Sequence, residues 1–298
     1  MKHLAISFVL ISFLAVSISS CSDSEEVADI ESYIKSLNSA NSDLEAYASK
    51  YPEAGYKELA EAADTIYDWA GKSIAVLGGS LAANDGGDVC KSLYCKLLHC
   101  SPIVTYARGG FGFATKGYSV LDFLPYLGQH DIYILWCSTN DYNTGIPVGE
   151  PTDYTEADGF NEKNAETQCG GMNKCIRSIR EAYPGALVVG FTSLPFFGEE
   201  ASREDGYSAA AKPCKGQDVN FSEYIEKQKE TFERADVPYF DQFAYGLFDI
   251  ENYTTFYVTD GFHLNRDGYF LLGCKQVAFF FDLIRKDPKG LYYYSRGF

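Results

Sequence analysis

Residues 74–82 read IAVLGGSLA, a run of four apolar side chains that ends in two glycines and a serine. A short apolar run bounded by glycine is typical of a buried strand, and the glycines let the chain turn sharply into the next segment. Strands that are buried on both faces occur in parallel sheets covered by helices. This stretch therefore indicates an α/β fold.

Further apolar runs follow at 103–106, 132–136, 186–191 and 237–240. The segments between and after them predict helices at about 87–98, 118–127, 162–183, 221–235 and 266–284. Five strands that alternate with helices predict a three-layer α/β/α domain with a flavodoxin-like, five-stranded parallel sheet. We expect this domain to span residues 71–298.

The segment before the domain has a different pattern. Residues 27–69 are polar with apolar side chains at helical intervals, which predicts two or three amphipathic helices interrupted at Pro52. We assign residues 21–70 to an acidic tether and this N-terminal helical extension. The sequence leaves open whether the helices pack on the main domain or act as a spacer.

The first 20 residues have the layout of a signal peptide: Lys2 comes early, an almost unbroken apolar run follows, and small residues precede Cys21. The small residues before Cys21 resemble a lipobox, which predicts lipidation of that cysteine; ordinary cleavage nearby is the alternative. The acidic residues at 22–26 resemble a tag for surface lipoproteins of Gram-negative cells. We expect an exported outer-membrane or cell-surface lipoprotein that contacts the membrane only through its anchor.

Composition restricts the partners. The chain has 25 Lys and Arg against 41 Asp and Glu, a formal charge of −16, which argues against a nucleic-acid partner. Eight of the nine cysteines remain when Cys21 is set aside, so disulfides are permitted but their pairing is not readable. The spacing of Cys90, Cys95, His99 and Cys100 lacks a paired C-x-x-C unit and disfavours zinc.

Candidate catalytic groups follow the first three strands, where the carboxyl ends of parallel strands form ligand sites. Ser80 follows the first strand, Gly109, Gly110 and Gly112 follow the second, and Asn140 follows the third. A serine at a strand-to-helix turn can present its hydroxyl, and an amide can donate a hydrogen bond to an oxyanion. Each residue type is also common in ordinary turns.

A stronger signal stands directly before the last predicted helix. Asp260 precedes His263 by three residues, so in a turn its carboxylate can reach the imidazole Nδ1 and leave Nε2 as a base. The chain has only four histidines, one of them in the predicted signal peptide. His99 and His130 fall at the amino edge of the predicted sheet, which leaves His263 for the opposite edge.

Together these motifs resemble the four blocks of the SGNH (GDSL-like) hydrolases, over residues 73–284. The blocks are Gly-x-Ser at the first strand, a glycine after the second, x-x-Asn-Asp after the third, and Asp-x-x-His near the C-terminus. The resemblance implies a serine esterase. Its triad is Ser80 as nucleophile and His263 as base, oriented by Asp260.

The resemblance also implies that Gly112 and Asn140 donate to the oxyanion together with the Ser80 amide, although Gly109 or Gly110 could take the place of Gly112. Two departures from the family pattern stand out: Gly79 replaces the usual aspartate before the nucleophile, and Ser138 replaces the usual glycine of the third block. The first removes a carboxylate that supports the nucleophile, and none of the reacting groups is lost.

Acyl transfer by these residues requires no metal or organic cofactor. A conventional α/β-hydrolase elbow would need glycine in place of Ala82. Cys137, at the end of the third strand, is better interpreted as a buried structural thiol than as a nucleophile.

The substrate is predicted less directly than the reaction. Surface location, acidic charge and the lack of a long apolar lid between Phe196 and Gly216 favour a carbohydrate O-acetyl esterase. The alternatives are a lipase or lysophospholipase, a thioesterase, or a non-catalytic SGNH-shaped glycan-binding lipoprotein.

Overall fold

The computed structural model describes residues 44–83, 87–154, 162–197, 219–245 and 247–286. The predicted signal peptide, Cys21, the acidic segment after it and Cys214 lie outside these residues. So does most of the loop predicted at 196–216, of which only Phe196 and Phe197 are described.

A parallel sheet forms the centre of the domain. Its strands are β1 (Ile74–Gly78), β2 (Ile103–Ala107), β3 (Ile132–Trp136), β4 (Leu187–Phe191) and β5 (Tyr239–Phe240). They lie in the order β2-β1-β3-β4-β5, and every neighbouring pair is parallel. The predicted flavodoxin-like sheet is confirmed. The order reverses direction beside β1, where an open α/β sheet forms its binding crevice.

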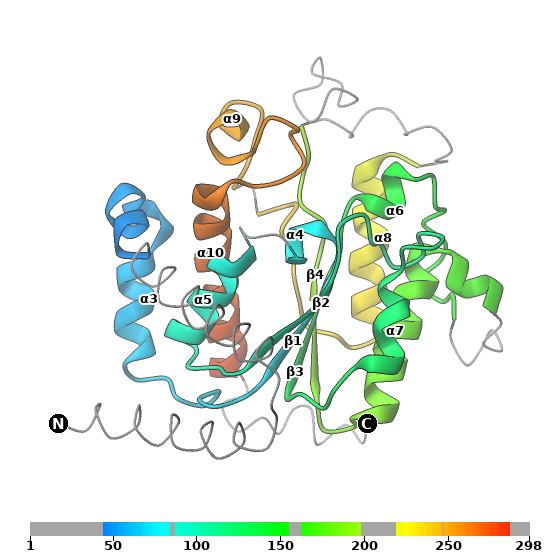
Figure 1. Cartoon of the computed structure of the whole chain (residues 1–298), viewed down its shortest axis with the longest axis horizontal. Coiled ribbons are helices and arrows are strands. Elements are labelled where there is room, and N and C mark those ends of the chain that lie inside the picture. Colours follow the sequence, from blue (N-terminus) through cyan, green and yellow to red (C-terminus); the bar gives the residue numbers. More distant parts are fainter. Residues whose placement is uncertain (1–43, 84–86, 155–161, 198–218, 246, 287–298) are drawn as a thin grey trace, which may run out of the picture. The chain divides into compact units, whose positions relative to one another are not determined.

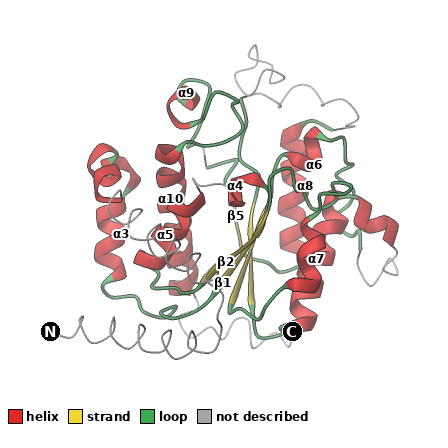
Figure 2. Cartoon of the chain, viewed as in Figure 1, coloured by secondary structure: helices red, strands yellow, loops and turns green. Residues whose placement is uncertain are grey.

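Helices cover both faces of the sheet, as Figures 1 and 2 show. The long helices are α5 (Gly87–Leu97), α7 (Gln168–Ala182), α8 (Phe221–Arg234) and α10 (Arg266–Lys286). Successive side chains of a strand point to opposite faces. Ile74 and Val76 therefore join the core beneath α5 and α10, whereas Ala75 and Leu77 join the core beneath α7. This two-sided burial explains why the strand runs are continuously apolar.

A glycine allows α5 and α10 to pack closely. A Cβ atom at Gly273 would lie 2.6 Å from Leu93 Cδ1, so a larger residue would push the helices apart. Of the helices in the described ranges, none has both the length and the apolar character needed to cross a bilayer.

The part of the N-terminal extension that the structure describes, residues 44–70, packs on the main domain. Residues 44–50 are helical, and η1 (Pro52–Ala54) and α3 (Tyr56–Ala63) follow. Tyr47 and Tyr56 both contact Phe270 of α10, with ring centroids 5.4 and 5.8 Å apart. The compact unit that contains the sheet begins at Leu44, so this part of the extension packs on the domain.

Short helices lie at the carboxyl ends of the strands and in the connections. They are α4 (Ser80–Ala83), α6 (Asn140–Asn143) and α9 (Tyr253–Phe256), with the 3-10 helices η2 (Val120–Tyr126) and η4 (Glu162–Glu166). The segment predicted as a helix at 118–127 is thus a 3-10 helix, and it contains Pro125.

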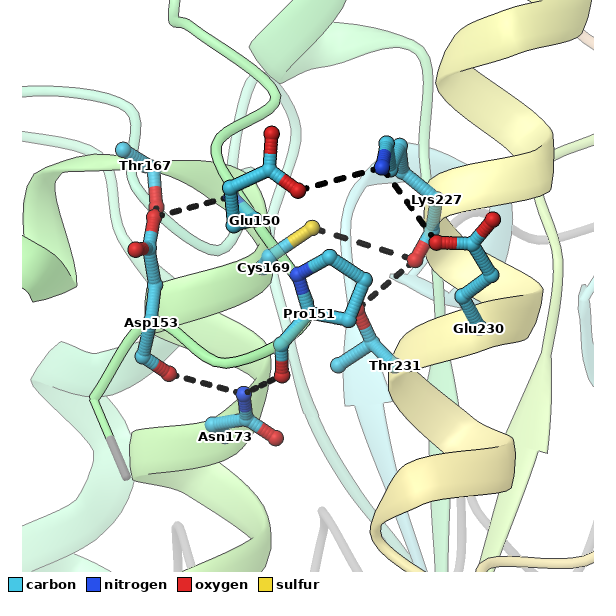
Figure 3. A network of polar contacts seen from close by, with 9 residues as sticks. All are labelled: Glu150, Pro151, Asp153, Thr167, Cys169, Asn173, Lys227, Glu230 and Thr231. Carbon is cyan, nitrogen blue, oxygen red and sulfur yellow. Dashed lines mark hydrogen bonds and ion pairs between the residues drawn. The ribbon is translucent and has the colours of Figure 1, made fainter. Parts of the chain in front are cut away.

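The loop after α6 is fixed by a polar network, drawn in Figure 3. The Asn173 amide on α7 donates to the carbonyls of Pro151 and Asp153, both at 2.8 Å. Lys227 on α8 pairs with Glu150 of the loop at 3.1 Å. Because the loop follows α6, which begins at Asn140, these contacts restrain the chain on the C-terminal side of that helix.

The seven cysteines within the described residues are free thiols, and most are buried. No group of three or more potential metal ligands comes together among the described side chains. His99 Nε2 instead contacts the Ala63 carbonyl at 3.0 Å, and its ring stacks on Tyr67.

Candidate active site

The turn between α9 and α10 brings Asp260 and His263 together as the spacing predicts. Asp260 Oδ2 lies 2.6 Å from His263 Nδ1, and Asp260 Oδ1 accepts the backbone N–H groups of Phe262 and His263 at 2.8 and 3.0 Å. An ionised carboxylate can only accept, so Nδ1 carries the hydrogen. Nε2 is therefore left with a lone pair directed away from Asp260.

Hydrogen bonding controls the charge of Asp260. Partial burial pushes the carboxyl pKa up, but the hydrogen bonds from the His263 ring and from two backbone N–H groups outweigh it. The pKa of Asp260 is consequently lowered, and the group stays ionised beside the imidazole. This is the charge needed to stabilise an imidazolium when His263 accepts a proton.

The turn is held from outside by the segment after β4. Phe262 stacks on Phe196 with ring centroids 5.0 Å apart and planes inclined by 15°. The Phe197 N–H donates to the Gly261 carbonyl at 2.7 Å. Gly261 and Phe262 are the two residues between Asp260 and His263. The contacts therefore restrain the turn that holds the imidazole.

Ser80 completes the predicted triad. It is the first residue of α4, separated from β1 by Gly79, and its Oγ lies 2.7 Å from His263 Nε2. Since Nε2 is the acceptor, the Ser80 hydroxyl donates this bond. No partner for the Ser80 backbone N–H is found in the part of the chain that the structure describes, and an N–H at a helix start is well placed for an anion.

Asn140 begins α6 at the end of β3, beside the nucleophile. Its Nδ2 donates to the Phe111 carbonyl at 2.9 Å. A Cβ atom at Gly79 would lie 2.8 Å from the same Nδ2, which shows how closely the amide approaches the backbone next to Ser80. An amide nitrogen carries two hydrogens, so the second remains for an oxyanion.

Gly112 is not placed as predicted. Its N–H donates to the Tyr118 carbonyl at 3.2 Å, and the carbonyl of the same peptide, that of Phe111, faces Asn140. In a planar trans peptide these two groups point in opposite directions. The Gly112 N–H therefore points away from the site, which contradicts its predicted role as oxyanion donor. The alternatives, Gly109 and Gly110, are exposed at the end of β2.

Asp141 anchors the loop after β2, a role that sequence reasoning missed. The fully buried carboxylate accepts hydrogen bonds from Phe113 N at 2.7 Å, Ala114 N at 3.1 Å and Thr115 Oγ1 at 2.7 Å. Burial raises the Asp141 pKa, although these bonds act in the opposite direction. The sequence did carry a signal for this role. An acidic residue directly after Asn140, at the end of a buried strand, is expected to need hydrogen-bond donors from a neighbouring loop.

Cys137 does not serve the site as a nucleophile. The thiol is fully buried at the end of β3, and burial raises its pKa well above the ordinary value. A reactive cysteine needs the opposite shift, because the thiolate is the nucleophile.

Comparisons with known proteins identify the family and the fold. A model of the GDSL-like lipase/acylhydrolase family matches residues 73–271. A solved structure from Lactobacillus plantarum is 13% identical with a TM-score of 0.57, covering 73% of this chain and 98% of its own. A possible lipase from Chitinophaga pinensis is 17% identical with a TM-score of 0.53, covering 72% of this chain and 98% of its own. The comparison with curated proteins finds no match.

Proposed function

The chain belongs to the GDSL-like lipase/acylhydrolase family of ester-hydrolysing enzymes, and from this premise we propose that Ser80 is its nucleophile and His263 its general base. The observation that carries the proposal is the continuous chain of short contacts from Ser80 Oγ through the imidazole to Asp260, 2.7 and 2.6 Å long. Such a chain of contacts activates a serine hydroxyl.

The contacts define the steps. His263 Nε2 takes the Ser80 proton as Oγ attacks the ester carbonyl, and the Ser80 N–H and Asn140 Nδ2 stabilise the oxyanion. His263 returns the proton to the departing alcohol, which leaves the acyl group on Ser80. Water then gives a proton to His263 and attacks the acyl-enzyme, and collapse of the second intermediate restores the Ser80 hydroxyl and releases the acid.

The first experiment replaces the nucleophile. Ser80→Ala is expected to lower kcat for p-nitrophenyl acetate by at least about 10³-fold, because acylation then has no nucleophile. A fluorophosphonate probe should label Ser80 of the native protein, as located by peptide mass spectrometry. Ser49→Ala, an exposed serine in the helical segment 44–50, is the matched control. Turnover that survives Ser80→Ala would overturn the assignment.

For the substrate, we propose an O-acetylated carbohydrate. The large hydrophobic side chains exposed within the described residues are four tyrosines and one valine: Tyr67, Tyr118, Tyr126, Tyr245 and Val258. Tyrosine presents a flat face with a polar tip, which suits a sugar better than an acyl chain. Tyr118 contacts Phe111 beside the site, with ring centroids 6.0 Å apart.

A substrate panel separates this proposal from the lipase, lysophospholipase and thioesterase alternatives. We expect acetate release from acetylated xylan, and p-nitrophenyl esters that are cleaved more slowly as the acyl chain lengthens from two to twelve carbons. Preference for the long chains, or fatty acid release from lysophosphatidylcholine, would favour a lipid substrate. Glycan binding by the native protein without any acyl-enzyme burst would favour the non-catalytic alternative.

We also propose that the protein is an exported lipoprotein, on the basis of the lipobox-like sequence before Cys21. Cells that express the full chain and grow with radiolabelled palmitate should yield a labelled protein. The Cys21→Ala variant should not be labelled. Equal labelling of both would contradict lipidation at this residue.

A further inference from the structure

The two departures from the family pattern meet at one backbone carbonyl. The carbonyl of Phe111 accepts hydrogen bonds from Asn140 Nδ2 at 2.9 Å and from Ser138 Oγ at 3.0 Å. A carbonyl oxygen has two lone pairs, so it can satisfy both donors. Ser138 stands where the family pattern has glycine, and its hydroxyl is one of the two donors.

Glycine at position 79 makes room for this arrangement. A Cβ atom there would lie 2.6 Å from the Phe111 carbonyl oxygen, 2.8 Å from Asn140 Nδ2 and 3.0 Å from Ser138 Cβ. Real Cβ atoms do not approach so closely, and two of the three neighbours are the bonded pair itself. An aspartate at 79 would therefore force the Phe111 carbonyl or the Asn140 amide to move.

The carbonyl and Ser138 are themselves held in place. Ser138 is 5% exposed, and its own carbonyl accepts a hydrogen bond from Ser193 Oγ at 3.0 Å. Ser193 is in turn bonded to the buried side chain of Gln228 on α8, through its N–H at 2.9 Å and its Oγ at 2.9 Å. This buried network restricts the movement of Ser138 relative to the sheet.

We propose that Ser138 and the Phe111 carbonyl position the Asn140 amide as an oxyanion donor, and that Gly79 is required to leave space for them. The inference rests on the proposed function, since it assigns Asn140 to the oxyanion. It makes Ser138 a positioning residue that acts through Asn140 and does not touch the substrate. On this proposal the two departures from the family pattern belong together: Gly79 leaves the space in which Ser138 and the Phe111 carbonyl position the amide. They are then not signs of lost activity.

A double-mutant cycle between Ser138→Ala and Asn140→Ala tests the proposal, with kcat and KM for p-nitrophenyl acetate as readouts. Ser138→Ala alone should lower kcat about tenfold with little change in KM, because it removes the bond from Ser138 Oγ to the Phe111 carbonyl and the longer one that Oγ accepts from the Asn140 N–H. In the Asn140→Ala background the same change should alter kcat by less than about twofold. An equal loss in both backgrounds would overturn the proposal.

Two further variants guard against a purely structural effect. Ser92→Ala removes another buried serine hydroxyl, which has no hydrogen-bond partner among the described residues, and it should leave kcat unchanged. Gly79→Ala should lower kcat at least as much as Ser138→Ala, because its Cβ displaces the carbonyl or the amide. Full activity of Gly79→Ala would contradict the proposal. Failure of the proposed function is recognised separately, since Ser80→Ala would then retain turnover.

Discussion

The two halves of the site are built in different ways. The Asp260–His263 half lies within one short turn, and the hydrogen bonds that Asp260 makes there reach residues at most three positions away. The Asn140 half is assembled at the ends of three strands, from Gly79, Phe111 and Ser138. The proton-transfer half matches the family pattern, whereas the oxyanion half departs from it at two positions. In the oxyanion half the two departures lie against the same carbonyl, that of Phe111, so they can compensate one another.

The comparison predicts different penalties in the two halves. In the proposed mechanism, each group of the turn acts on the proton that moves in every step. In the pocket, the oxyanion keeps the Ser80 N–H when a second donor is lost. Substitutions in the turn should therefore reduce turnover more than substitutions in the pocket.

The largest effect is expected for Asp260→Asn. An amide in this position can donate to Nδ1 and stabilise the wrong tautomer of His263, so Nε2 would no longer accept the Ser80 proton. We expect kcat to fall by about 10³- to 10⁴-fold with little change in KM. Asp68→Asn, at an exposed position before β1, is the control for loss of one negative charge. A fall of less than tenfold would show that the turn is not the proton-transfer unit.

A smaller effect is expected for Asn140→Ala. Removal of one oxyanion donor lowers kcat by about 10²- to 10³-fold in hydrolases that use such a site. We expect a value near the upper end, because the Gly112 N–H is bonded to Tyr118 and does not replace the lost amide. Steady-state kinetics with p-nitrophenyl acetate measures the change. An unaltered kcat would mean that the oxyanion is held elsewhere.

The same contrast explains what the sequence could predict. The Asp-x-x-His spacing defines a geometry by itself, because three residues of turn suffice to bring the carboxylate to Nδ1. The strands were predictable since both faces of β1 and β3 are buried and their sequences are continuously apolar. The four-residue helices α4, α6 and α9 were not, because so short a helix shows no periodic pattern.

The error at Gly112 has a physical cause. Glycine leaves the peptide between residues 111 and 112 free to point either way, and the choice depends on the partners of its carbonyl and its N–H. Here Asn140 and Ser138 bind its carbonyl and Tyr118 accepts its N–H. Nothing in the residues around Gly112 identifies those partners. The direction of a donor in a pocket built from several strands is thus set by tertiary contacts.

A weaker effect tests the support of the turn. Phe262→Ala removes the ring that stacks on Phe196, and we expect a loss of about 1–2 kcal/mol in stability, below the range for fully buried rings because Phe262 is partly exposed. The imidazole should also lose orientation, with kcat lower by about tenfold. Tyr126→Ala, at a ring that is 78% exposed, is the control. Lower stability with unchanged kcat would show that the turn holds its geometry without this contact.

The smallest effect concerns stability at acid pH. The pKa of Asp260 is lowered in the folded protein, so its ionised form stabilises the fold above the unfolded-state pKa of about 3.9. That contribution is lost as the pH falls through the folded-state value. Native protein should therefore be more stable than Asp260→Asn at neutral pH, and the difference should shrink as the pH falls below about 4. Since the Asp260 side chain is 43% exposed, solvent weakens the effect. Thermal melts from pH 7 to pH 3 measure the difference, and one that grows toward low pH would contradict the direction of the pKa shift.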